Sequence, residues 1–230
     1  MLTTTIAVIL GLLPGFAWLT FYLTEDPHPE PKRLVLFTFL AGIAFGFFAV
    51  IVEHFWTTAG GDFGIAEFSI VSLLGLAVIE ELTKFAAAYF SISRTPEMSD
   101  PIDPMVYMIV AALGFATLEN IGTLVNLHTS GTPMLLAALQ TVSFRFVGAT
   151  LLHTLTSGLV GYHWSLGHAK KKPVRFLISG LIFATLVHTA FNYLTLYAVT
   201  LAIPILFLLV VGLFVLNDFE VLREKEVVAK

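Results

Sequence analysis

The sequence predicts an all-α fold, a polytopic transmembrane helix bundle of about seven spans. The composition indicates this first, because 57% of the 230 residues are hydrophobic and only 12% are charged. Soluble domains carry about 25% charged residues. The mean hydropathy is +0.89, and a soluble chain of this length could not bury so much apolar surface in one core. Lipid is therefore the expected solvent, and the apolar stretches and the placement of the charges agree with this.

Seven apolar stretches are long enough to cross a bilayer as helices, which takes about 20 residues. In chain order they are Thr3–Thr24, Leu34–Val52, Glu67–Phe90, Pro104–Leu127, Pro133–His163, Val174–Tyr197 and Val199–Asn217. The first is interpreted as a retained span, because no basic segment or small-residue cleavage site accompanies it. The fifth is long, so we expect it to tilt or to leave the membrane in its last turns. The prediction is one transmembrane domain over residues 1–217, with core motifs at 67–197, and a short charged tail at 218–230.

Basic residues alternate between the predicted loops. The loops after spans one, three and five, and the segment after span seven, contain Lys or Arg, whereas the loops after spans two, four and six contain none. Cytoplasmic loops carry the excess of basic residues in membrane proteins. The alternation therefore predicts an N-terminus outside the cell and a C-terminus in the cytoplasm.

Seven ionisable side chains fall inside the predicted spans, where a charge costs at least about 2.5–3.5 kcal/mol on insertion scales. They are Glu80, Glu81, Lys84, Glu119, Arg145, His153 and His188. Three glutamates face one lysine, one arginine and two titratable histidines, so we expect a paired interior cluster. Glu53 and His54 close the second predicted span near the interface, and we expect both to be solvated.

Helical spacing places each of these side chains on a small, polar stripe of its helix. Glu81 and Lys84 share one face of the third span, where a Glu–Lys pair at this spacing can meet directly. Arg145 is expected to orient Glu119 or Glu81, and Asn120 to form a hydrogen bond between helices. Lipid cannot accept such stripes, so those of four successive spans should converge.

Two kinds of chemistry fit such a cluster, and the residues alone leave both open. In the first, one of the adjacent carboxylates of Glu80 and Glu81 takes a proton from an attacking water. His188 and Asn192, one helical turn apart, would then donate hydrogen bonds to the developing oxyanion.

The second kind of chemistry uses a metal ion. Glu119, His153 and His188 have the side-chain types that hold zinc in hydrolytic sites, and three such ligands leave a fourth position for water. Either arrangement would hydrolyse an amide bond. A zinc cofactor is therefore a candidate rather than a requirement at this point.

Several sequence strings together resemble the PrsW family of intramembrane proteases. They are VIEELTK at 78–84, GFATLEN at 114–120, FRFVGATLLHT at 144–154 and HTAFN at 188–192. The segments DPHPEPKR at 26–33 and DPIDPMVY at 100–107 resemble the same family. Four motifs in family order on four successive predicted helices are specific, and the resemblance runs from about Glu25 to Asn192.

This family is similar to the CAAX-protease and bacteriocin-processing group. The resemblance implies that Glu80 activates water and that His188 and Asn192 bind the oxyanion. Lys84 stands where that group has an arginine, one residue closer, and Glu119 replaces an expected histidine. The PrsW family is also classed as metallopeptidase-like, which keeps metal-assisted chemistry open. The implied substrates are membrane-tethered proteins such as anti-sigma factors, cut near the bilayer face of a prokaryotic plasma membrane.

Other functions remain to be weighed against a peptidase. Glutamate and histidine chains also form relays in proton-coupled transporters and channels, although the sequence shows neither inverted repeats nor broken helices. Haem held between His153 and His188, or an inactive membrane scaffold, are further alternatives. The absence of cysteine excludes thiolate sites and disulfides, and no basic stripe indicates nucleic acid as a partner.

Overall fold

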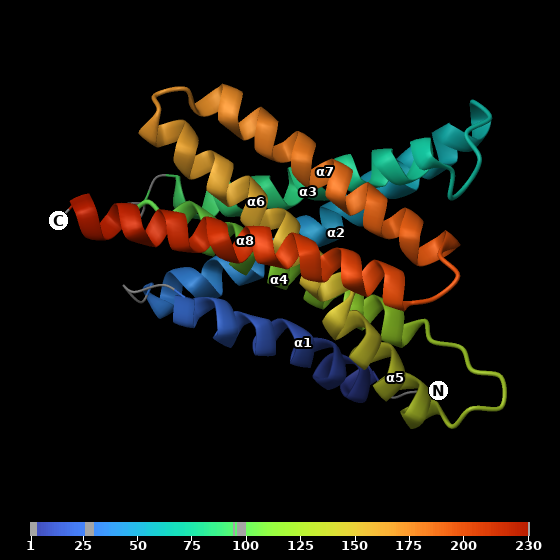
Figure 1. Ribbon diagram of the computed structural model, residues 1–230. Helices are drawn as coiled ribbons and strands as arrows, with labels where there is room; N and C mark the ends of the chain where they lie inside the picture. The colour runs from blue at the N-terminus through green and yellow to red at the C-terminus, as the bar shows by residue number, and fades with distance from the viewer. Residues whose placement is uncertain (1–3, 26–29, 94, 96–99, 230) are drawn as a thin grey trace.

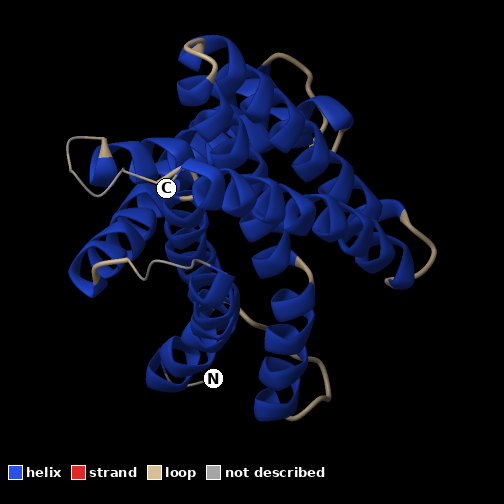
Figure 2. Cartoon of the chain, turned by 60° about the vertical axis from the view of Figure 1, so that its left-hand side comes forward, coloured by secondary structure: helices blue, strands red, loops and turns tan. Residues whose placement is uncertain are grey.

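The structure is a computed structural model that describes residues 4–25, 30–93, 95 and 100–229 (Figure 1). These residues form eight helices and no strand (Figure 2). The helices are α1 (Thr4–Glu25), α2 (Lys32–Asp62), α3 (Ile70–Ile92), α4 (Asp103–Val125), α5 (Met134–Val147), α6 (Ala149–Ala169), α7 (Pro173–Tyr197) and α8 (Ala202–Ala229). The predicted all-helical bundle is therefore confirmed. The start of the 26–33 segment, Arg94 and Lys230 lie outside the described residues.

Helix α4 is the centre of the bundle. It packs against α1, α2, α3, α5 and α6, and every residue from Asp103 to Thr117 is buried. Large apolar side chains instead cover the outside of the peripheral helices, including Phe47 on α2 and Leu213 on α8. Apolar side chains in such numbers on the surface need lipid around them. The molecule is accordingly a multi-pass membrane protein.

Six segments are long and apolar enough to cross a membrane, and together they contain every helix except α3. Helix α3 carries three charged residues, Glu80, Glu81 and Lys84, on a 23-residue helix that is otherwise apolar or small. It still lies within the bundle, packed against α2, α4, α6 and α7. The predicted third span is therefore a helix whose polar content is buried in protein rather than in lipid. The predicted orientation of the termini stays a prediction.

The predicted fifth span is two helices rather than one. Helix α5 ends and α6 begins at Gly148, whose φ of −110° and ψ of −99° are not helical. A Cβ atom on Gly148 would lie 2.7 Å from the carbonyl oxygen of Phe144, so glycine allows the chain to turn tightly here. The expectation that no helix is broken was wrong. Broken helices at membrane depth are tolerated where they are buried in protein or line a cavity.

Two further boundaries differ from the prediction. Helix α2 does not end at Val52 but continues to Asp62, which moves Glu53 from a helix end into a helix interior. At the other end of the chain, α8 runs on to Ala229, so the backbone of residues 218–229 continues the last helix. Hydropathy located the apolar part of each helix but not the polar turns that extend it.

The α2–α4 contact brings two helix backbones together. A Cβ atom on Gly114 would lie 2.0 Å from the carbonyl oxygen of Phe39, and one on Gly42 would lie 2.0 Å from that of Ala111. Both positions are closed to any larger residue unless a backbone moves. This close approach holds the α2 face that carries Glu53 against the central helix.

We expect Gly114→Ala to destabilise the protein by about 1–3 kcal/mol, because the added methyl group forces the two backbones apart. Gly122→Ala is the matched control on the same helix, since nothing lies within 4 Å of a Cβ atom there. Reversible unfolding in mixed detergent micelles measures both variants. Equal stability of Gly114→Ala and Gly122→Ala would contradict the close packing.

Candidate active site

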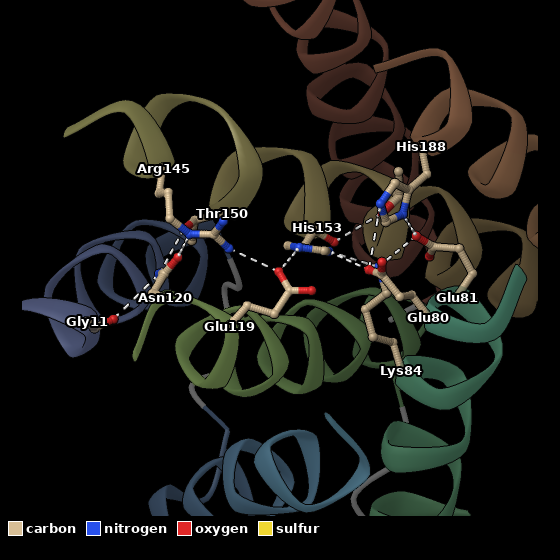
Figure 3. Close-up of polar contacts among 11 residues, drawn as sticks. Gly11, Glu80, Glu81, Lys84, Glu119, Asn120, Arg145, Thr150, His153 and His188 are labelled. Atoms are coloured by element: carbon tan, nitrogen blue, oxygen red, sulfur yellow. Dashed lines mark hydrogen bonds and ion pairs between the residues drawn. The ribbon is translucent and has the colours of Figure 1, made fainter. Parts of the chain in front are cut away.

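The seven ionisable side chains of the predicted spans meet in one connected cluster, as Figure 3 shows for the polar contacts. Five of them are buried, and Glu119 and Arg145 are part-buried. Helix α3 supplies Glu80, Glu81 and Lys84, and the remaining four come one each from α4, α5, α6 and α7. The predicted convergence of the polar stripes is therefore confirmed. The cluster joins residues as far apart in the sequence as Glu81 and His188, which form a direct hydrogen bond.

Lys84 is the buried cation of the cluster. Its Nζ donates to Glu81 Oε1 at 2.6 Å, one helical turn away, and both side chains are 0% exposed. Nζ also lies 3.1 Å from Nδ1 of His153 and 5.6 Å from the ring centroid of Phe115. Two buried charges at this distance stabilise one another, but either alone would be uncompensated.

His188 is held by Glu81 through one ring nitrogen. The Nδ1 atom lies 2.7 Å from Glu81 Oε1, and a carboxylate can only accept, so Nδ1 carries the proton. In the neutral imidazole, Nε2 then has a free lone pair. That atom lies 3.6 Å from Oε2 of Glu80. The fixed tautomer therefore presents an electron pair toward Glu80.

His153 has the same arrangement with its nitrogens exchanged. Its Nε2 lies 2.8 Å from Oε2 of Glu119, which also accepts from Nη2 of Arg145 at 3.0 Å. The Nδ1 atom is left with its lone pair and lies 3.7 Å from Oε2 of Glu80. Arg145 therefore pairs with Glu119, one of the two partners predicted for it. Glu119 in turn orients the imidazole of His153.

Oε2 of Glu80 therefore lies between two imidazole nitrogens that have lone pairs and no proton to donate. It is buried, and within the described part of the chain it has no hydrogen-bond partner. Glu80, His153 and His188 each offer one ligand atom, and these atoms lie within 4.8 Å of one another. Three acceptors that face one another can bind a cation, and here it would share the Nδ1 lone pair of His153 with Lys84 Nζ, 3.1 Å away.

The spacing fits zinc. Zinc–nitrogen and zinc–oxygen bonds of about 2.0–2.2 Å in a tetrahedron place neighbouring ligand atoms about 3.4 Å apart. The two distances from Glu80 Oε2 are 3.6 and 3.7 Å. The predicted ligand set was Glu119, His153 and His188, whereas the carboxylate that faces both histidines in the structure is Glu80. Glu119 instead contacts the far nitrogen of a ligand, where carboxylates orient metal-binding histidines.

A fourth carboxylate, Glu53, belongs to the same cluster and was expected to be solvated. Its Oε1 atom is buried and makes no hydrogen bond to the residues that the structure describes. It interacts electrostatically with Glu119, Lys84 and Glu80. A signal was present in the sequence, since Gly42, Gly46, Ala49 and Glu53 recur at the spacing of one helical face. The structure buries the first three of these four residues.

The charges of this extended cluster do not balance. Four carboxylates stand against two basic side chains, and the histidines are neutral in the tautomers given by their hydrogen bonds. The carboxylates are Glu53, Glu80, Glu81 and Glu119, and the basic residues are Lys84 and Arg145. A formal excess of two negative charges is costly in a site buried within a membrane protein. Either protons taken up by two of the carboxylates or a bound divalent cation would cancel it.

Asn120 ties helices together beside the cluster. Its Nδ2 donates to Oγ1 of Thr150 at 3.1 Å and to the carbonyl oxygen of Gly11 at 3.5 Å. Its Oδ1 accepts from Nε of Arg145, at the end of α5. The prediction of an interhelical hydrogen bond is confirmed. Asn120 thereby fixes the break between α5 and α6, and with it the position of Arg145.

Asn192 lies one turn after His188 on α7 and is half-buried. Among the described residues its side chain has no hydrogen bond to the cluster, so its assignment to the oxyanion stays a prediction.

The haem alternative fails on geometry. The rings of His153 and His188 lie edge to face with centroids 5.3 Å apart, which leaves no room for a porphyrin.

Comparison with known proteins gives a consistent result. The model of the family described as PrsW family intramembrane metalloprotease matches residues 30–217. Protease PrsW of Geobacillus kaustophilus is 30% identical over 190 residues, which cover 81% of this chain and 78% of that protein. Protease PrsW of Bacillus subtilis is 28% identical over 80% of each chain, and that of Clostridioides difficile is 23% identical over 91% of this chain and 86% of its own. No solved structure matches.

The family match covers most of the chain, including every residue of the cluster. Its description as a metalloprotease agrees with a buried set of two histidines and a carboxylate that face one another. Both findings favour a peptidase over a transporter or channel. This chain belongs to the PrsW family of intramembrane metalloproteases.

Proposed function

We propose that this intramembrane peptidase cleaves membrane-tethered proteins at a metal site formed by Glu80, His153 and His188. One observation carries the proposal. Three buried acceptor atoms face one another, and the described residues place no hydrogen-bond donor on Glu80 Oε2. Two histidines and one glutamate are the ligands of a common class of zinc peptidase, which keeps one position open for water.

The metal would polarise the scissile carbonyl and favour ionisation of a water, as it does in other hydrolases. The residues of this chain would hold and orient it. Glu81 fixes the ring of His188 and Glu119 that of His153, each through the nitrogen that faces away from Glu80. Such outer partners set the tautomer and raise the basicity of the ligand.

The resemblance to the CAAX-protease group implies instead that Glu80 itself activates water without a metal. The geometry favours Glu80 as a ligand, because its Oε2 atom faces both histidine lone pairs. In either version Asn192 is the proposed donor to the oxyanion, one turn from His188. Lys84 and Arg145 compensate the carboxylates that orient the histidines.

The proposed substrate is a membrane-tethered protein, of the anti-sigma-factor kind, cut near the bilayer face of a prokaryotic plasma membrane. The relatives named as proteases come from bacteria, which supports that location. The site itself is buried among helices, so a substrate segment has to reach it from within or beside the bilayer. Peptide hydrolysis in that setting requires a protected water, which the polar cluster can hold.

Cleavage of a single-span reporter protein in proteoliposomes tests the function. We expect the wild-type protein to cut the reporter and His188→Ala to lose at least about a hundredfold in kcat/KM, since it removes both a ligand and the partner of Glu81. His128→Ala, at an exposed loop position, is the matched control and should cut normally. Normal cleavage by His188→Ala would show that this cluster is not the catalytic site.

Metal removal is a separate prediction. Dialysis of the purified protein against a strong chelator should lower the rate of cleavage by at least about a hundredfold, because it removes the metal ion that the two histidines and the glutamate would bind. One equivalent of zinc should restore the rate. Full activity of a chelated protein shown by elemental analysis to be metal-free would exclude the metal-assisted version and leave the glutamate version.

A further inference from the structure

We propose that Glu53, on α2, is the general base that takes the proton from the attacking water in this site. The inference rests on the proposed metal-assisted hydrolysis, and it assigns the one role that the described ligand set leaves open. A glutamate that binds the metal is a poor proton acceptor, because its lone pairs are already shared with a cation. Zinc peptidases therefore use a separate glutamate as base.

The other carboxylates of the cluster are committed to partners. Glu81 accepts from Lys84 at 2.6 Å and from His188 at 2.7 Å through the same oxygen. Glu119 likewise accepts from Arg145 at 3.0 Å and from His153 at 2.8 Å. Charge-assisted hydrogen bonds of this kind hold a carboxylate in its ionised form and in a fixed direction. Both groups are therefore weaker proton acceptors than a carboxylate without such partners, although Glu81 Oε2 itself has no hydrogen-bond partner among the described residues.

Glu53 is placed on the inward face of α2. Gly42, Gly46 and Ala49 are buried at helical spacing along that face, and Glu53 comes next in the series. Its Oε1 atom is buried without a hydrogen-bond partner among the described residues. A carboxylate in such surroundings is costly unless it pairs or performs a function.

The packing of α2 on α3 brings Glu53 to within about one helical turn of the level of Glu80. The two helices run antiparallel: Trp56 Nε1 donates to the carbonyl oxygen of Ser72 at 3.2 Å, and further along, the rings of Phe45 and Phe90 stack with centroids 5.9 Å apart. Glu53 precedes Trp56 by about one turn, and Glu80 lies about two turns after Ser72, between these two contacts. The electrostatic interactions of Glu53 with Glu80, Glu119 and Lys84 agree with this placement.

The proposed step conserves atoms and charge. The Glu53 carboxylate accepts one proton from water while the water oxygen bonds to the carbonyl carbon of the peptide. The carbon–nitrogen bond then breaks, and Glu53 returns the proton to the leaving nitrogen. One water is consumed, the products are a carboxylic acid and an amine, and Glu53 ends as the carboxylate with which it began.

The test compares Glu53→Gln with the wild-type protein for reporter cleavage, KM and zinc content in the same preparation. We expect kcat to fall by about 10²–10⁴-fold, with KM and one bound zinc per chain unchanged. Glu80→Gln should differ by losing the zinc as well as the activity. Glu220→Gln, exposed on α8, is the matched control for the loss of a glutamate charge and should match the wild type in all three measurements.

Two results would overturn the assignment. A Glu53→Gln protein that retains wild-type kcat shows that Glu53 takes no proton, and one that loses its zinc shows a ligand instead of a base. Glu53→Ala covers the case in which glutamine prevents folding, since it removes the carboxylate without adding a buried amide. That variant should keep its zinc with kcat lowered by about 10²–10⁴-fold, and wild-type kcat would again refute the base. The proposed function is tested separately, by metal-dependent cleavage of the reporter by the wild-type protein, and does not depend on the result for these variants.

Discussion

Glu80→Gln should abolish reporter cleavage, with kcat/KM lowered by about a thousandfold or more. The carboxylate oxygen that faces both histidines becomes one atom of an amide, which has no negative charge and orients an NH₂ group as readily as its oxygen. Loss of a metal ligand or of a general base lowers the rate by at least the factor that one catalytic group contributes. The measurement is the initial rate of reporter cleavage in proteoliposomes at several substrate densities.

Folding has to be shown separately for this variant. Glu80 has no hydrogen-bond donor on Oε2 among the described residues, so in metal-free samples the neutral amide should leave the stability equal to or above that of the wild type. Circular dichroism and detergent-unfolding midpoints supply that control. A folded Glu80→Gln protein with wild-type kcat/KM would contradict both the metal version and the glutamate version of the mechanism.

Lys84→Met should destabilise the protein by about 3–5 kcal/mol. Methionine keeps much of the lysine volume but removes the ammonium group, which lies 2.6 Å from Glu81 Oε1 with both side chains 0% exposed. The Glu81 carboxylate would then be buried with only His188 beside it. The free energy of unfolding, measured reversibly in mixed micelles, reports the loss. Arg175→Met, which removes an exposed basic side chain, is the control and should change it little.

The double variant Glu81→Gln/Lys84→Met separates a lost ion pair from a packing defect. Removing both charges leaves no uncompensated carboxylate at this position, so we expect the double variant to recover at least half of the stability that Lys84→Met loses. A double variant as unstable as the single one would show that the lysine acts through packing. Lys84→Met with wild-type stability would contradict the buried pair itself.

Much of the site could be predicted because burying a charge in a membrane is costly. Glu81, Lys84, His153 and His188 are conspicuous in apolar helices, and the requirement that they pair brings them together without coordinates. The ligand set could not be predicted in full. Glu80 and Glu119 are both carboxylates within the predicted spans, and only the three-dimensional directions of the two imidazoles decide which of them lies between the histidines.

Two other features could not be predicted because averaged hydropathy does not register them. Glu53 follows an apolar run, and an average over residues treats it as the end of a span, although helical spacing continues the buried face to it. The break at Gly148 has no polar signal, since a single glycine in a helical pattern is usually tolerated. Both features are decided by the contacts of one residue rather than by composition.

X-ray absorption at the zinc edge of the purified wild-type protein is the most direct test of a metal held by the buried cluster. We predict two imidazole nitrogens and at least one oxygen at about 2.0–2.2 Å, with one imidazole contribution lost in His153→Ala. An active protein with no bound metal, or with a metal that has no histidine ligand, would contradict the account.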